Sequence, residues 1–544
     1  MKKFLALFLA LVLVLGLVAC GGKGGNETGG EDGDAVKLTI GIQPNAYILD
    51  RYENALTKWI ESECGVKLEF VEYAGGTDVG TQISTTIAGR QELPDILFGI
   101  NLDEVTRHKY GKEGYFVNLK SYFDDKEGAS KTFWERFENE LNEQDQENVL
   151  LEMIDPADGA IYAIPGIETS LFDGMNYQTW INTEWLDKVG KKKPTNKEEL
   201  LDVLRAFKDT DCNGNGVADE IPLYGSVNAG LGGHILDWIT NFFVYYDRDC
   251  PYLVGDDGKL TRVQITDAYR EALKFLNTMY KEGLLPDVVF TAGQGELKQV
   301  TTPASGTAMA GIFVGHLTVH CTQGSPVLEQ YEPLQTWGYA IRRPNMVGLN
   351  NLISADCDNP DKAFEVMMKL WSKEGSYRLR YGEKGVNWTE PDEGAKSVIG
   401  LDATLKILKD PITTQNTVLW GSVSCTLNVH AEAESAQLAE EMDPWMKMKM
   451  NMHAESSKLF TEAGEKNNPE VVCPKLALSV PEKEETASER LNISGIITKA
   501  RADFIRGDGK DINNDADWNA YLKELNDMGL EKVVKQDQAA YDRQ

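Results

Sequence analysis

Recognisable catalytic motifs are absent from the sequence. No GxSxG, HExxH or P-loop pattern occurs, and the six histidines show no metal-ligand spacing. These absences exclude the common arrangements for nucleophilic, zinc-dependent and nucleotide-dependent catalysis, so we predict a protein that is not an enzyme and has no catalytic residues. Paired carboxylates are frequent in so acidic a chain, however. Glycoside hydrolysis by two carboxylates, or a calcium-assisted lyase reaction, therefore stays open as an alternative.

The eight cysteines lack a pairing pattern. None lies in a CxxC motif or at Cys/His ligand spacing, so the sequence indicates neither a disulfide framework nor a zinc site. If Cys20 is modified, as argued below, seven cysteines remain, and an odd number cannot all pair. We expect most of them to be small buried apolar residues.

Basic residues are in the minority. Lys and Arg number 55 against 85 Asp and Glu, which gives a formal net charge of −30. Such a surface repels phosphate backbones and anionic headgroups, so we exclude nucleic acid as a partner.

Only one long hydrophobic run is present, at the start of the chain. Two lysines precede an apolar stretch over Phe4–Ala19, which ends at Cys20. This stretch is short for a bilayer-spanning helix, which needs ~20 residues, but it fits a signal-peptide core. The segment resembles a bacterial lipoprotein signal. The resemblance implies that residues 1–19 are removed and that Cys20 carries lipid such as palmitate; the alternative is an uncleaved transmembrane anchor.

Residues 20–35 are rich in glycine and acid, and they indicate a flexible tether. No later segment approaches eighteen consecutive apolar residues. With lipid on Cys20, we therefore expect the chain at the extracellular face of the cytoplasmic membrane, held there by the anchor alone.

Strand-like and helix-like segments alternate after the tether. Residues 36–42 alternate apolar with polar or small side chains, 55–60 hold an apolar helical face, and 66–73 have the pattern of a second strand. A helical stretch around Ile83 and a proline-led strand over 93–98 follow. This order predicts the α/β doubly wound class, with a mostly parallel sheet covered on both faces. Ligands bind at the carboxyl ends of such strands.

Several short motifs follow one another in a specific order. They are LPDI at 93–96, DGAIYAIP at 158–165, WINTEWLDKVG at 180–190, YKEGLLP at 280–286, GTAM at 306–309 and a carboxyl-terminal helix over 518–529. Together they resemble family 1 of the bacterial extracellular solute-binding proteins, over nearly all of the chain beyond the tether.

The resemblance implies a periplasmic-binding-protein-like fold, in which two α/β lobes, each with a mainly parallel sheet flanked by helices, are joined by two or three hinge crossings. The N-terminal lobe would comprise residues 36–170 and 343–395, and the C-terminal lobe residues 171–342 and 396–544. It also implies a monomer that captures an oligosaccharide in the interlobe cleft and delivers it to the permease subunits of an ABC importer. A surface adhesin that binds glycans without transport is a further alternative.

Residues 209–220, DTDCNGNGVADE, are dense in the oxygen ligands that calcium requires. Two registers are possible. The first has EF-hand spacing and uses Asp209, Asp211, Asn213, Gly214 and Glu220. The second, which we prefer, uses Asp211, Asn213, Asn215, the Val217 carbonyl, Asp219 and Glu220, and it resembles the calcium loop of the family's alginate-oligosaccharide-binding members. Pro222 obstructs the exiting helix of a paired EF-hand, so we expect a structural ion; without an ion the segment would be an Asx-rich turn.

Sugar rings are bound by flat aromatic faces and by side chains that accept hydrogen bonds from hydroxyls. The 11 tryptophans of the chain are consistent with that chemistry. By motif position, the resemblance places ligand contacts at Asn101, Asp103, Glu168, Phe313 and His316, with Trp238, Trp388 and Trp420 as further aromatic candidates. Trp238 belongs to an aromatic row at helical spacing, however, and such rows are usually core.

Overall fold

The computed structural model describes residues 35–44, 48–74, 79–156, 158–169, 172, 174–230, 232–334, 337–342, 346–409, 426–429, 435–440, 442 and 444–544. Cys20 and Trp420, two of the residues singled out from the sequence, lie outside those ranges, as does the tether up to residue 34.

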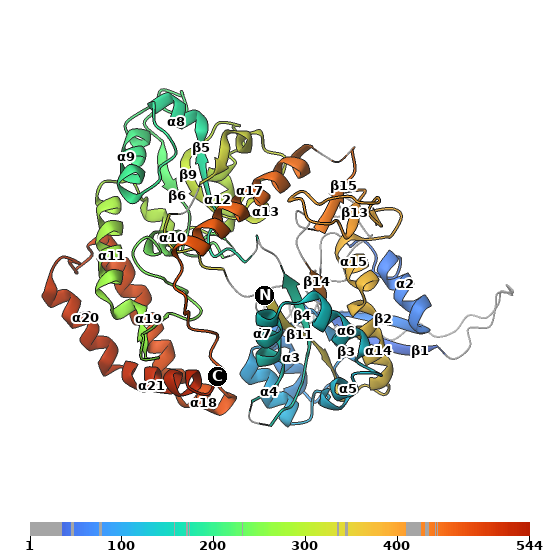
Figure 1. Ribbon diagram of the computed structural model, residues 1–544. Coiled ribbons are helices and arrows are strands. Elements are labelled where there is room, and N and C mark those ends of the chain that lie inside the picture. Colours follow the sequence, from blue (N-terminus) through green and yellow to red (C-terminus); the bar gives the residue numbers. More distant parts are fainter. Residues whose placement is uncertain are drawn as a thin grey trace, which may run out of the picture. The chain divides into compact units, whose positions relative to one another are not determined.

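A six-stranded sheet organises the amino-terminal part of the chain (Figure 1). Its strands lie in the order β14 (Leu427–Val429), β4 (Ile164–Thr169), β11 (Met346–Ile353), β3 (Ile96–Phe98), β1 (Val36–Ile42) and β2 (Val66–Glu72). β1 runs parallel to β3, and β14 runs parallel to β4. β11 lies between β3 and β4 and is antiparallel to both, so β3 and β4 point the same way.

The helices of this region are α2 (Ala55–Cys64), α3 (Val79–Ala88), α4 (Glu104–Lys112), α5 (Lys120–Asp124), α6 (Lys131–Glu140), α7 (Glu143–Met153), α14 (Pro360–Trp371) and α15 (Lys373–Tyr381). Their ends follow local rules. The Asn54 side chain accepts a hydrogen bond from Leu56 N at the start of α2, and Gly65 ends that helix at φ 64°, a conformation that favours glycine.

A four-stranded sheet organises the second part of the chain. Its strands lie in the order β10 (Tyr331–Pro333), β5 (Thr179–Asn182), β9 (Ala310–Val314) and β6 (Ile221–Tyr224). β6 and β9 are parallel, whereas β5 is antiparallel to both β9 and β10. The helices between these strands are α8 (Thr183–Val189), α9 (Lys197–Lys208), α10 (Ile235–Thr240), α11 (Asp267–Lys281), α12 (Gln294–Thr301) and α13 (Leu317–His320), with 3-10 turns at Val263–Ile265, Asp287–Phe290 and Pro326–Gln330.

The carboxyl-terminal helices join the core of this second part. They are α17 (Pro444–Asn467), α18 (Val480–Glu485), α19 (Ala487–Arg506), α20 (Asp515–Asp527) and α21 (Leu530–Tyr541). The contact between α11 and α19 illustrates how they do so. Leu273 and Leu276 share a buried cluster with Phe504, and Asn277 Nδ2 donates to the Phe504 carbonyl at 3.1 Å. A hairpin of β7 (Tyr252–Val254) and β8 (Leu260–Arg262) packs nearby against α21.

A three-stranded sheet completes the described elements, with β12 (Trp388–Thr389), β13 (Leu405–Ile407) and β15 (Ala436–Leu438). It has a small core of its own, which includes Trp388 and the α15 residues Tyr377 and Tyr381.

The α/β class expected from the sequence is confirmed, and in each large sheet one strand, β11 in the first and β5 in the second, runs antiparallel to both strands beside it. The first sheet also takes β14 from residues 396–544, the range that the sequence assigned to the C-terminal lobe. No helix in the described ranges is both long and apolar enough to cross a membrane.

Candidate functional site

The first sheet carries polar residues where β3 and β4 end. Both strands are antiparallel to β11, so their carboxyl ends lie at the same edge of the sheet; Asn101 and Asp103 follow β3 at this edge, and Glu168 lies near the end of β4. Asn101 is exposed in the loop after β3. Asp103 begins α4, and its Oδ1 accepts a hydrogen bond from Thr106 N at 2.9 Å.

Glu168 is held in a buried ion pair at this edge. Arg380 Nη1 donates to Glu168 Oε1 at 2.6 Å, and the two side chains are only 11% and 7% exposed. The pair joins β4 to α15. A charge-assisted hydrogen bond of this kind holds both side chains in place, and it puts a carboxylate and a guanidinium at this edge of the first sheet.

The second sheet has a corresponding edge. β6, β9 and β10 point the same way, because β5 is antiparallel to both β9 and β10 and β6 is parallel to β9. Their carboxyl ends lead into the segments that hold Trp238, His316 and Trp337. Residues 174–178, which precede β5, lie beside two of these segments, because Gln178 N donates to Gly232 O and Gly315 N donates to Gln178 O.

Aromatic rings gather at this second edge. Trp238 packs edge-on against Phe242, with ring centroids 5.1 Å apart, and Trp337 stacks on Phe242 at 4.9 Å. Trp238 is 0% exposed, whereas Phe242 and Trp337 are only partly buried. Trp238 was a candidate from the sequence, whereas Trp337, whose ring is more accessible, was not.

Two other aromatic candidates lie in cores. Phe313 is fully buried in β9 and packs edge-on against Tyr331 at 4.9 Å. Trp388 is 3% exposed, and its Nε1 donates to the Gly382 carbonyl at 2.9 Å. Their burial favours a structural role in this conformation.

Several buried polar atoms at the second edge have no hydrogen-bond partner among the described residues. They are both amide atoms of Asn176, Oε1 of Gln178, Nε1 of Trp238, Nε1 of Trp337 and Nε2 of His453. A buried polar atom without a partner costs about 1–3 kcal/mol, and in native proteins such atoms are rare away from water or ligand. Sequence reasoning missed Asn176 and Gln178. The sequence feature that could have indicated them is that these two polar residues flank the apolar Tyr177 just before β5, a strand-like alternation.

Histidines form part of the same edge. His316 N donates to His320 Nδ1 at 2.8 Å, so that ring nitrogen is an acceptor and His320 Nε2–H donates to the Ala229 carbonyl at 2.8 Å. Burial lowers the pKa of His320 to about 4. His453 stacks on Phe172 with centroids 3.4 Å apart, and burial likewise holds its pKa well below the ordinary value.

We expect this neutral His320 to make the protein acid-sensitive. Its folded pKa of about 4 lies below the ordinary value of 6.5, so between these values the unfolded chain binds more protons and stability falls as pH is lowered. At 1.36 kcal/mol per pH unit, the loss is on the order of 3 kcal/mol. The check is urea unfolding at pH 7, 5.5 and 4.5. His320→Gln should flatten the pH slope, and equal slopes in both proteins would contradict the assignment.

A histidine and two carboxylates also meet in the first part of the chain. His108 Nδ1 lies 2.7 Å from Asp155 Oδ2, and the ligand atoms of His108, Asp155 and Asp158 are all within 4.8 Å of one another. Lys112 Nζ lies 3.2 Å from Asp158 Oδ2, however. Because that ammonium already neutralises Asp158, we interpret the group as an ion-pair network that ties α4 to the turn after α7.

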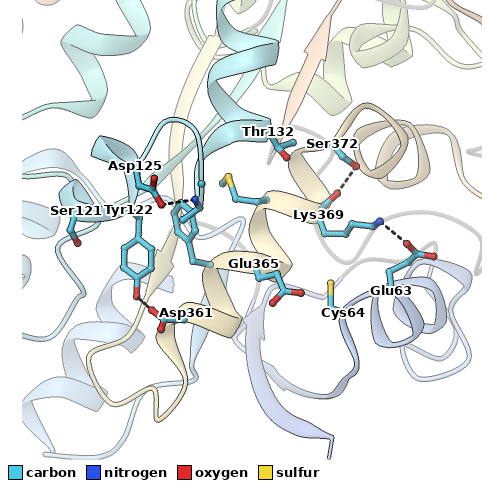
Figure 2. Close-up of a pocket in the computed structure, with 14 residues that line it drawn as sticks. Glu63, Cys64, Ser121, Tyr122, Asp125, Thr132, Asp361, Glu365, Lys369 and Ser372 are labelled. Atoms are coloured by element: carbon cyan, nitrogen blue, oxygen red, sulfur yellow. Dashed lines mark hydrogen bonds and ion pairs between the residues drawn. The ribbon is translucent and has the colours of Figure 1, made fainter.

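A cavity of about 940 Å³ lies between α2, α5, α6 and α14 (Figure 2). Figure 2 shows two bonded pairs of side chains in its lining: Tyr122 Oη donates to Asp361 Oδ1 at 2.6 Å, and Lys369 Nζ donates to Glu63 Oε2 at 2.6 Å. Burial, followed by the bond to Asp361, raises the pKa of Tyr122 to about 12. Among the sequence-predicted ligand residues that the structure describes, none lines this cavity, so we assign it no ligand.

The acidic loop 209–220 is coiled around the Asp211 carboxylate. Asp211 Oδ1 accepts from Gly214 N at 2.7 Å and from Asn215 N at 3.1 Å, and its Oδ2 accepts from Gly216 N at 3.0 Å. Gly214 and Gly216 have φ of 74° and 76°, the left-handed region that favours glycine.

Side chains from both ends of this loop converge. Asn213 Nδ2 lies 2.8 Å from Asp219 Oδ1, Asn215 Nδ2 lies 3.1 Å from both Asp219 oxygens, and Glu220 Oε1 accepts from Asn213 N at 3.2 Å. Rotation of either amide by a half turn would bring its oxygen to the place that its nitrogen holds. The carboxylate and amide oxygens of this loop could therefore gather around one point, and such oxygens are the ligands that a calcium ion prefers.

The curated relatives match parts of the chain, and no family model matches it. The chain is 30% identical over 247 residues to the fructooligosaccharide ABC transporter substrate-binding protein FusA of Streptococcus pneumoniae serotype 4, which covers 44% of this chain and 43% of the relative. It is 36% identical over 107 residues to lipoprotein LipO of Bacillus subtilis strain 168, which covers 19% and 20%. The match thus spans less than half the length of either relative.

Solved structures resemble the chain over most of its length. FusA of S. pneumoniae in complex with kestose has a TM-score of 0.71 and 20% identity, and an HMO-binding solute-binding protein of Bifidobacterium longum infantis has 0.72 and 20%; each covers 93% of this chain and 99% of the other. Alginate-binding protein AlgQ2 without calcium ion has 0.62 and 19%, covering 94% and 99%. The chain is therefore similar in sequence to FusA over 247 residues, and it shares the two-lobed α/β fold of these solved structures over most of its length.

Proposed function

We propose that the protein is a lipid-anchored, extracellular solute-binding protein that captures an oligosaccharide and delivers it to the permease of an ABC importer. The single observation that carries this proposal is the second edge, where partly buried Trp337 and Phe242 lie beside buried polar atoms without partners. Aromatic faces for sugar rings and amide groups for hydroxyls are the chemistry that a glycan needs. The relatives agree, since FusA is named for fructooligosaccharides.

The ligand residues that we propose come from both sheet edges. From the first edge we propose Asn101, Asp103 and Glu168, as the sequence indicated. From the second we retain His316 and add Asn176, Gln178 and Trp337. Ligand that contacts both sets would favour a closed form over an open one by its differential affinity, and the closed form would be presented to the permease. Such a mechanism requires no catalytic residue.

Thermal unfolding of residues 35–544 across a panel of soluble glycans and short peptides tests this proposal. A ligand at ~100 times its dissociation constant adds ~2.7 kcal/mol of stability to the folded protein. We expect a selective upward shift with a class of oligosaccharide and none with peptides. No shift with any soluble glycan, together with retention on insoluble polymer, would favour an adhesin instead.

We also propose that the loop 209–220 binds a structural calcium ion. The residues that would hold it are Asp211, Asn213, Asn215, the Val217 carbonyl, Asp219 and Glu220. The convergence of Asn213 and Asn215 on Asp219 supports this register. An EF-hand mutant of FusA, with a TM-score of 0.70 and 20% identity to this chain, indicates that a loop of this kind exists in a relative.

Calcium should therefore stabilise the protein through Asp219. We expect calcium at ~100 times its dissociation constant to add ~2.7 kcal/mol to the free energy of unfolding, and Asp219→Ala to abolish that gain. Asp209→Ala is the matched control, because Asp209 belongs only to the EF-hand register. The measurement is thermal unfolding with calcium or with chelator. Loss of the gain in Asp209→Ala but not in Asp219→Ala would favour the other register.

A further inference from the structure

Two cysteines that are far apart in the sequence meet in the structure. Cys250 Sγ lies 3.3 Å from the Pro474 carbonyl oxygen, and Cys473 Sγ lies 3.5 Å from the same atom. The two thiols also contact each other, and that contact, followed by burial, raises the pKa of Cys250. Each residue is 8% exposed, so the pair lies just beneath the surface.

The two thiols belong to one small cluster. Its members are Cys250, Tyr252, Leu260 and Cys473, with Val254, Leu476, Val534 and Tyr541 packed against them. The cluster thus joins the β7–β8 hairpin, the segment between α17 and α18, and α21. No other described cysteine has a second thiol among the groups that shift its pKa.

We propose that Cys250 and Cys473 form a disulfide once the protein meets an oxidising disulfide outside the cell. The thiolate of one cysteine attacks a sulfur of the external disulfide and releases one thiol, and the other cysteine then attacks the mixed disulfide and releases the second. The two protein thiols together lose two protons and two electrons, and the external disulfide is reduced to two thiols. The resulting bond closes a loop of more than 200 residues, so it constrains the unfolded chain strongly.

Peptide mapping by mass spectrometry tests this proposal on the unaltered chain of residues 20–544. One sample is treated with oxidised glutathione and one with reductant, and free thiols are alkylated after denaturation. We expect a cross-linked peptide that contains Cys250 and Cys473 in the oxidised sample alone, together with a rise in the unfolding midpoint of about 3 °C.

Variants separate this bond from the other thiols. Cys473→Ser should remove both the cross-link and the difference in midpoint, whereas Cys321→Ser, at a buried cysteine elsewhere, should retain both. Glutathione left attached to Cys250 or Cys473, or two alkylated thiols in the oxidised sample, would overturn the proposal. If Cys473→Ser does not fold, the peptide map of the unaltered chain still shows whether Cys250 and Cys473 are linked. This result does not depend on which solute the protein binds.

Discussion

Replacing Glu168 with alanine is expected to destabilise the protein by about 3 kcal/mol, even without any glycan. Arg380 Nη1 donates to Glu168 Oε1 at 2.6 Å, and both side chains are nearly buried. Removing the carboxylate would take the Glu168 partner from a guanidinium in a site from which most water is excluded, and that loss is much larger than the loss of an exposed ion pair. The measurement is urea unfolding of the protein without ligand.

The matched control is Asp124→Ala. Asp124 pairs with Lys120 at 2.7 Å on the surface, where the two side chains are 63% and 49% exposed, so its loss should change stability by less than about 1 kcal/mol. A stability loss for Glu168→Ala as small as that of the control would show that Glu168 does not hold the edge together. If Glu168→Ala lost glycan binding but kept its stability, Glu168 would contact the ligand without contributing to the stability of the fold.

Replacing Gly338 with alanine should cost about 3 kcal/mol as well. A Cβ atom there would lie 2.2 Å from the Asn241 carbonyl oxygen and 2.8 Å from its carbon, which are backbone atoms. Asn241 cannot retreat easily, because its Nδ2 donates to the carbonyls of Asp237 and Tyr246 and its Oδ1 accepts from Tyr246 N. Since Gly338 adjoins Trp337, the variant should also weaken glycan binding.

Gly295→Ala is the control for this substitution. No heavy atom lies within 4 Å of its would-be Cβ, and it belongs to α12, so alanine should be neutral or stabilise the helix by up to about 1 kcal/mol. The comparison is the unfolding midpoint of the two variants in urea. Equal stability of Gly338→Ala and the parent chain would contradict the close approach at Asn241.

Local structure could be predicted well from this sequence. The alternation over residues 36–42 and the apolar face of residues 55–60 gave a strand and a helix where the structure has β1 and α2. The Thr266 side chain, next to the first residue of α11, caps that helix by accepting a hydrogen bond from Tyr269 N. Periodicity and capping depend on neighbours in the chain, so one sequence suffices to predict them.

Long-range features could not be predicted in the same way. The insertion of β11 between β3 and β4 and the pairing of β14 with β4 depend on segments separated by hundreds of residues. The meeting of Cys250 with Cys473 is of the same kind, and an odd cysteine count gave no hint of it.

The candidate site was predicted in outline only. The sequence pattern placed Asn101 and Asp103 after the third strand, and the structure has them directly after β3. Aromatic residues were harder, because spacing alone does not distinguish Trp238, which is buried, from Trp337, whose ring is partly accessible. Exposure depends on the neighbours of a ring in space, and one sequence does not contain that information.

Titration calorimetry of residues 35–544 with the oligosaccharide class that shifts the unfolding midpoint, followed by mass analysis of the recovered glycan, tests the central claim most directly. We predict that one glycan binds per chain, that its mass is unchanged after incubation, and that Trp337→Ala abolishes the binding heat. A shortened glycan would show that the protein is an enzyme. Full binding by Trp337→Ala would show that the ligand does not bind at the second edge.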